Sequence, residues 1–122
     1  MLNIVNKAST FQSKAQPGGW NDMDMLEVGN GGMSLTEYRA HFSMWCLLAA
    51  PLMAGNDIRT MNGDIRDILT NKEVIADQDA LGREGRRVRR TGGLEVWARQ
   101  LMDGGRAVAL LNRTGDEAGI TV

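Results

Sequence analysis

Residues 34–50, SLTEYRAHFSMWCLLAA, form the stretch of sequence that decides the fold. Ser34 and Glu37 make an S-x-x-E capping box, which is typical of the first turn of a helix. Apolar side chains then recur on one stripe at helical spacing, and from Met44 onward the other faces are apolar too. The pattern predicts a helix over residues 34–50 that Pro51 ends and that is buried against a large partner.

Short apolar segments on either side of this helix are predicted to be buried strands. Residues 18–22 precede the helix and open into a loop at 23–33, and residues 52–54 follow it. Helical spacing also appears at residues 2–8 and 64–69. The alternation of strand, loop and helix predicts an α/β arrangement with a parallel sheet.

The pattern changes from residue 86 onward. Strand patterns at 86–90, 94–101 and 107–112 are separated by Thr-Gly-Gly and Asp-Gly-Gly, which are typical of hairpin turns. The last of these strands is apolar on both faces, so we expect cover on both of its sides.

These two patterns predict two structural units. Two parallel strands and an unfinished antiparallel sheet cannot each close a core, so we expect this chain to be a piece of a larger protein. The boundary is predicted near residue 85, with an α/β unit over 1–85 and an antiparallel unit over 86–122.

Composition excludes several classes of protein. The 122 residues carry 14 Lys plus Arg against 15 Asp plus Glu, so no overall charge favours nucleic acid or an anionic membrane. One cysteine (Cys46) and one histidine (His41) supply neither an intrachain disulfide nor a four-ligand zinc site. No apolar run is long enough to span a membrane, and the first residues lack the features of a signal peptide.

The densest polar cluster is Trp20-Asn21-Asp22-Met23-Asp24-Met25, where the first predicted strand ends. Functional groups collect at the carboxyl ends of parallel strands. In extended backbone, Asp22 and Asp24 lie on one side of the strand, about 7 Å apart. Glycoside hydrolysis needs two carboxyl groups on opposite faces of the sugar, so these two are not a catalytic pair. The alternative is that both carboxylates bond to backbone groups of the following loop.

Other polar residues favour structural roles. The glycines at 29–32 lack the Lys-Ser/Thr of a phosphate loop and are interpreted as a flexible pocket rim. Asp57 follows the second predicted strand and is more typical of a turn cap than of a site. His41 is predicted to be a surface or packing residue, and Cys46 an inert core thiol.

Five arginines lie within eight residues, and they are the one feature that favours a polyanionic partner. Exposed arginines that alternate along a strand near a domain junction are ordinary, and no aromatic residue lies among them. We therefore predict no nucleic-acid binding. The arginines are Arg83, Arg86, Arg87, Arg89 and Arg90.

Residues 17–26, PGGWNDMDML, followed by GNGG at 29–32, resemble the seventh-strand segment of one glycosidase family. This is the α-galactosidase and α-N-acetylgalactosaminidase family of retaining glycoside hydrolases. The likeness covers nearly the whole chain. It continues through Trp45, APL at 50–52, NDIR at 56–59, NKEVIA at 71–76, QDALG at 78–82, EVW at 95–97 and AVALLN at 107–112.

The resemblance implies the C-terminal part of a (β/α)8 barrel, with strands seven and eight and their helices, followed by the first strands of an antiparallel β-sandwich. It places both catalytic aspartates upstream, so no residue of this chain is catalytic. By position, Asp24 and Met25 match residues that line the galactose pocket, and Asp22 and Trp20 match residues that support it. Met23 stands where the family usually has proline, which predicts a less rigid loop.

The activity implied is hydrolysis of terminal α-galactosyl residues by double displacement, with no metal or organic cofactor. This piece alone is expected to be inactive. The substrate implied is an α-galactoside, and the family is mostly extracellular or lysosomal. Two alternatives stay open: an α-N-acetylgalactosaminidase of the same family, and a non-catalytic carbohydrate-binding module. The natural substrate and the oligomeric state do not follow from the sequence.

Overall fold

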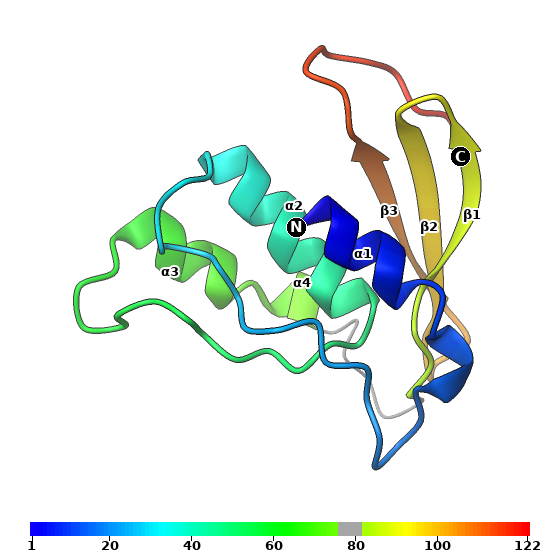
Figure 1. Ribbon diagram of the computed structural model, residues 1–122, viewed down its shortest axis with the longest axis horizontal. Helices are drawn as coiled ribbons and strands as arrows, with labels where there is room; N and C mark the ends of the chain where they lie inside the picture. The colour runs from blue at the N-terminus through cyan, green and yellow to red at the C-terminus, as the bar shows by residue number, and fades with distance from the viewer. Residues whose placement is uncertain (76–81) are drawn as a thin grey trace.

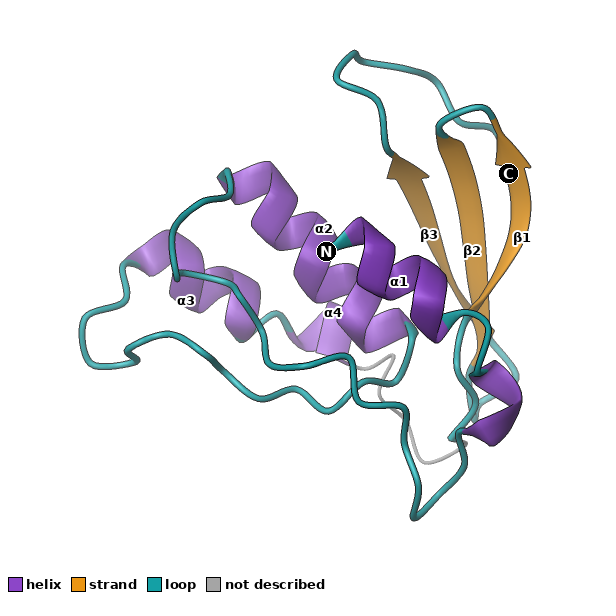
Figure 2. Cartoon of the chain, in the orientation of Figure 1, coloured by secondary structure: helices purple, strands orange, loops and turns teal. Residues whose placement is uncertain are grey.

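The computed structural model describes residues 1–75 and 82–122 (Figure 1). Helices occupy the first part of the chain and a sheet the last, as Figure 2 shows by colour. Predictions that fall on residues 76–81, which include part of the family-like motifs, lie outside the described residues. In order, the elements are α1 (Leu2–Ala8), a 3-10 helix η1 (Gln12–Lys14), α2 (Leu35–Leu47), α3 (Gly63–Leu69), α4 (Lys72–Ile75), β1 (Arg86–Thr91), β2 (Leu94–Gln100) and β3 (Arg106–Asn112).

Helix α2 begins as the sequence predicts and ends earlier. The Ser34 hydroxyl accepts from the Glu37 N–H, and the Glu37 carboxylate accepts from the Ser34 N–H at 2.7 Å, which confirms the capping box. At the other end, Ala49 adopts φ +53°, its N–H donates to Cys46 O, and the Ala50 N–H donates to Trp45 O. This is a Schellman motif. The helix therefore ends at its own cap rather than at Pro51.

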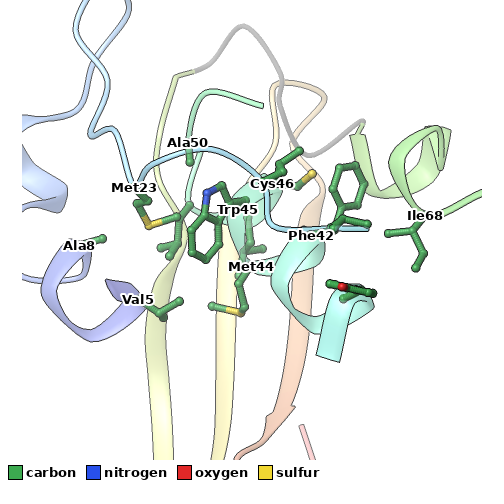
Figure 3. Packing of buried hydrophobic residues seen from close by; sticks show 14 of the residues in the cluster. Val5, Ala8, Met23, Phe42, Met44, Trp45, Cys46, Ala50 and Ile68 are labelled. Carbon is green, nitrogen blue, oxygen red and sulfur yellow. The ribbon is translucent and has the colours of Figure 1, made fainter. Parts of the chain in front are cut away.

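The apolar core is built around α2. Trp45 and Cys46 are fully buried, and Met44 and Phe42 project to other sides of the same helix (Figure 3). Residues from α1, α3 and the sheet complete the cluster, so the predicted burial of α2 is confirmed. They include Val5, Ala8, Ile65, Ile68, Trp97 and Leu111.

The two strands predicted at 18–22 and 52–54 do not form. Gln16 and Gly19 pair with each other instead, so the intervening Pro17-Gly18 is a tight turn. Leu26 and Ala54 form one isolated parallel bridge: the Leu26 N–H donates to Met53 O at 2.8 Å, and the Gly55 N–H donates to Leu26 O at 3.0 Å. A ladder needs several successive pairs, and among the described residues the chain around Leu26 meets the chain around Ala54 in this one bridge.

The three predicted antiparallel strands are confirmed, with order β1-β2-β3. Thr91 pairs with Leu94 across a two-residue turn whose first residue, Gly92, has φ +59°, a conformation that favours glycine. The register shifts between Arg87 and Arg89, which marks a β-bulge in β1.

Strand β3 is covered on one side only. Ala107, Ala109 and Leu111 face the helices and pack on the core. Val108 and Leu110, which point the other way, are about half exposed. The described residues supply no full cover for this second side, so the expected cover there stays a prediction. The end of the chain, residues 119–121, lies instead beside β1 and β2 on the outer face (Figure 1).

A buried carboxylate holds the sheet together. Glu95 is fully buried, and Arg87 and Arg113 approach its Oε1 at 3.0 and 2.9 Å. The Trp97 Nε1–H donates to its Oε2 at 2.9 Å. Burial raises the pKa of Glu95, but the hydrogen bonds from Arg113 and Trp97 and the charges of Arg113 and Arg87 outweigh burial, so the net pKa is lowered. Arg90 also pairs with Glu95, so two of the five clustered arginines act within the sheet.

Replacing Glu95 by Gln is expected to lower the free energy of unfolding of this chain by about 2–4 kcal/mol, because it leaves Arg87 and Arg113 without a buried counter-charge. Urea unfolding followed by tryptophan fluorescence measures the change. Asp57→Asn, which breaks the exposed Asp57–Arg59 pair, is the matched control and should leave the midpoint almost unchanged. Equal midpoints for the two variants would contradict a stabilising role for Glu95.

Candidate functional site

The polar segment 20–26 runs from the Gln16–Gly19 turn to the Leu26–Ala54 bridge. Its first anchor is Asn21, whose Nδ2 donates to Phe11 O and to Glu84 Oε1, both at 2.9 Å. Burial raises the pKa of Glu84, while the hydrogen bond from Asn21 and the charge of Arg99 act against that rise. The segment is therefore tied at its start to both the helical part and the residues that lead into the sheet.

Asp22 and Asp24 do not have the extended geometry predicted for them. Asp22 Oδ1 accepts from the Asp24 N–H at 2.9 Å, and Asp24 Oδ1 accepts from the Met25 N–H at 2.8 Å. Asp24 has φ +75°, in the left-handed region that Asp tolerates better than most residues. The strand-like placement of both carboxylates on one side is therefore wrong, and the alternative, bonding to the backbone of the following loop, is confirmed.

Two ring side chains of α2 form hydrogen bonds with the backbone of residues 24–27. The Trp45 indole Nε1–H donates to Asp24 O at 2.9 Å, and His41 Nε2 accepts from the Glu27 N–H at 3.0 Å. In Figure 3 the indole nitrogen points away from the helix toward the loop that follows Met23. The two rings contact each other with centroids 3.9 Å apart. His41 is buried, so the packing alternative for this residue is confirmed and the surface alternative is wrong.

His41 is held in its neutral form. Burial is the main reason that its pKa falls to about 4, and the positive charge of the N-terminus adds to the effect while Glu27 opposes it. A neutral imidazole whose Nε2 accepts a hydrogen bond carries its proton on Nδ1. The ring is therefore a fixed acceptor for the loop at neutral pH.

Asp22 and Asp24 open on a shared pocket of about 420 Å³. Its opposite wall comes from α1 and the residue that precedes η1, with Ile4, Lys7 and Phe11. Carboxylates opposite apolar side chains suit a sugar, because hydroxyl groups can donate to the oxygens while C–H groups pack on Ile4 and Phe11.

The other predicted site residues lie around this pocket rather than in its wall. Met25 is 46% exposed, and its side chain packs against Gly55. A Cβ added at Gly55 would lie only 2.7 Å from the Met25 sulfur. Trp20 is 41% exposed, and its ring lies beside Gly82. Met23, the departure from proline, is buried in the core. The structure thus groups the two aspartates and leaves Met25 and Trp20 exposed nearby.

Asp57 and Cys46, which the sequence predicts to be structural residues, have structural roles. Asp57 accepts from the Arg59 N–H at 3.0 Å and pairs with its guanidinium at 2.7 Å. The side-chain bond to Arg59 is the main cause of a lowered pKa for Asp57. Cys46 is a buried thiol. The glycine loop is tied to α2 where the Gly31 N–H donates to the Tyr38 hydroxyl at 2.7 Å.

The structure also bears on metals and membranes. Within residues 1–75 and 82–122, no three His, Cys, Asp or Glu side chains gather as the ligands of a metal ion would. In the same part of the chain, no helix has both the length and the apolar character to cross a membrane.

Comparison with known proteins now identifies the family. A family model described as alpha galactosidase A matches residues 2–79, and another, described as the alpha galactosidase A C-terminal beta sandwich domain, matches residues 82–122. The chain belongs to the α-galactosidase A family. The resemblance drawn from the motifs is thereby confirmed. The fold class is confirmed as well: part of a (β/α)8 barrel followed by strands of an antiparallel β-sandwich.

Individual relatives agree with the family. An α-galactosidase of rice (Oryza sativa subsp. japonica) is 56% identical over 122 residues, which cover 99% of this chain and 29% of that protein. Crystallised α-galactosidase I of Mortierella vinacea is 44% identical with a TM-score of 0.88, over 91% of this chain and 28% of that one. The Saccharomyces cerevisiae α-galactosidase solved with raffinose is 36% identical with a TM-score of 0.85, over 91% and 27%. This chain thus spans less than a third of the relatives it matches.

Sequence reasoning missed the residues that hold the site in place. His41 and Trp45 are one helical turn apart, and a polar ring inside an otherwise apolar stretch was the available signal. The pairing of Asn21 with Glu84 joins residues 63 positions apart, so no local pattern could indicate it.

We expect the stability of this chain to fall as the pH drops from about 6.5 to about 4. The pKa of His41 in the folded state is about 4. The unfolded chain takes up the proton near pH 6.5, so over this range it binds more protons than the folded chain. The loss should be about 2–3 kcal/mol, measured by urea unfolding at pH 7 and at pH 4.5.

The control is His41→Gln, which keeps an acceptor and does not titrate. Because His41 is the sole histidine, the difference between the two proteins above pH 5 isolates its contribution. Parallel pH profiles for the two would show that His41 titrates normally in the folded chain.

Proposed function

We propose that this chain forms one wall of the galactose pocket of a retaining α-galactosidase. Asp24 and Met25 contact the sugar, and Asp22 and Trp20 support them. The observation that carries the proposal is that Asp24 and Met25 are exposed at a backbone that Asp22 and Trp45 hold on either side. Side chains that are exposed on a backbone held in place are what substrate positioning requires.

The mechanism proposed is double displacement through a covalent galactosyl-enzyme, with retention at the anomeric carbon. The nucleophile and the acid/base are proposed to come from other barrel strands. Asp24 accepts hydrogen bonds from sugar hydroxyls, Phe11 packs on the C–H face from the pocket wall, and Met25 contacts the sugar from the rim of the pocket. Positioning of this kind lowers the activation barrier without a covalent bond between the sugar and this chain.

Further parts of the proposal concern the whole protein. Its substrate is proposed to be an α-galactoside, in keeping with the raffinose named with the yeast relative. Secretion is proposed from family likeness. The domain boundary is proposed at residues 85 and 86, where β1 begins. The relatives are named α-galactosidases, which favours this activity over the N-acetylgalactosaminidase and binding-module alternatives.

The isolated 122-residue chain is expected to release no nitrophenol from p-nitrophenyl α-galactoside, because neither catalytic carboxylate is proposed to lie in it. A continuous absorbance assay at high protein concentration checks this, with rice α-galactosidase as the positive control. Turnover would refute the assignment of the catalytic pair to other strands. Cooperative unfolding together with measurable galactose binding would instead favour the binding-module alternative.

The binding role of Asp24 and Met25 can be tested in a chimera. This chain would replace the matching segment of the rice α-galactosidase, which it resembles at 56% identity. We expect the chimera to hydrolyse the substrate. Asp24→Asn should lower kcat/KM about 10–100-fold, since a charge-assisted hydrogen bond contributes about 1.5–3 kcal/mol. Met25→Ala should lower it about tenfold through lost contact with the sugar.

The control for these variants is Asp67→Asn. It makes the same chemical change on α3, at an exposed carboxylate outside the pocket. This variant should retain the parent kcat/KM. A chimera whose activity is equally insensitive to all three substitutions would rule out the proposed sugar contacts.

A further inference from the structure

His41 and Trp45 lie one turn apart on α2 and bond to the two ends of a single loop segment. Trp45 donates to Asp24 O at 2.9 Å, and His41 accepts from the Glu27 N–H at 3.0 Å. The rings are in contact with each other, at 3.9 Å between centroids. We call this arrangement the His41–Trp45 clamp. It fixes the two residues between these anchors, Met25 and Leu26, at two points on one rigid helix.

The backbone at Asp24 needs such support. Its φ of +75° lies in the left-handed region, which costs free energy for a residue with a side chain. The bond from Asp22 to the Asp24 N–H holds one side of the residue, and the bond from Trp45 to its carbonyl holds the other. Release of either bond would allow the peptide to relax and would turn the Asp24 carboxylate and the Met25 side chain.

Packing alone does not explain why a histidine occupies position 41. His41 is 1% exposed, and its Nδ1 has no hydrogen-bond partner among the described residues. A buried polar atom without a partner loses its hydrogen bonds to water, a cost that an apolar side chain of similar size would avoid. What the imidazole provides in return is an acceptor for the Glu27 N–H.

We propose that His41 and Trp45 are positioning residues for sugar binding. They do not touch the substrate. They set the backbone of residues 24–27 and thereby place the Asp24 carboxylate and the Met25 side chain. This inference rests on the proposed function, in which those two residues contact galactose.

The chimera with rice α-galactosidase tests the clamp through a split between KM and kcat. Trp45→Phe keeps the ring and removes the indole N–H, and His41→Leu removes the acceptor. Each should raise KM about five- to tenfold, the equivalent of one lost hydrogen bond, with kcat within about twofold of the parent. His41→Gln, whose amide oxygen can accept from the Glu27 N–H, should return KM to within about twofold.

Tyr38→Phe is the matched control. It removes another bond from α2 to a loop backbone, the one between the tyrosine hydroxyl and the Gly31 N–H, outside the clamped segment. A comparable fall in Tm with an unchanged KM is expected. If Trp45→Phe and His41→Leu also lower Tm while leaving KM unchanged, their role is purely structural and the proposal is overturned.

A second measurement does not depend on activity. Amide hydrogen exchange of the 122-residue chain should become faster at residues 24–27 in Trp45→Phe and His41→Leu, and at Gly31 alone in Tyr38→Phe. Unchanged exchange at 24–27 overturns the clamp. An inactive parent chimera with this exchange pattern intact would count against the proposed function and leave the clamp standing.

Discussion

The second half of helix α2 is enclosed on nearly every side, and the remaining elements are arranged by what they pack against it. Its second half is almost entirely buried, including Met44, Trp45 and Cys46. An interior this dense leaves little room for rearrangement. The polar atoms on the same helix then become fixed reference points, and backbone groups of the preceding loop bond to His41 and Tyr38. The position of the pocket wall thus follows from the burial of one helix.

The sheet is connected to the helices by charge as well as by apolar contact. Arg113 Nη1 donates both to Glu95 Oε1 and to Asn6 Oδ1, each at 2.9 Å, and so joins β2 to α1. The buried Arg99 Nη1 donates to Cys46 O at the end of α2. Buried charges of this kind add specificity of arrangement when every partner is in place, since removal of one partner leaves the other uncompensated. The barrel part and the sandwich part therefore meet in a defined geometry.

Within a complete α-galactosidase, this segment would supply position rather than chemistry. The two aspartates that the sequence suggests as a pair bond to their own loop and share a pocket wall, so their geometry suits binding. Asp24 holds a conformation that only a surrounding framework can maintain. Strain at a site of this kind is offset by the packing of the helix behind it.

Local patterns in the sequence determined α1, the start of α2, α3 and all three strands, because capping boxes, apolar periodicity and glycine turns act over a few residues. The family motifs located the polar segment 20–25. Tertiary structure alone decided that the Asp24 backbone turns left-handed, that His41 reaches Glu27, and that residues 18–22 form no strand, with a tight turn at Pro17-Gly18 instead. A strand exists only where a neighbour pairs with it, and a buried hydrogen bond depends on residues that the fold brings together from distant positions.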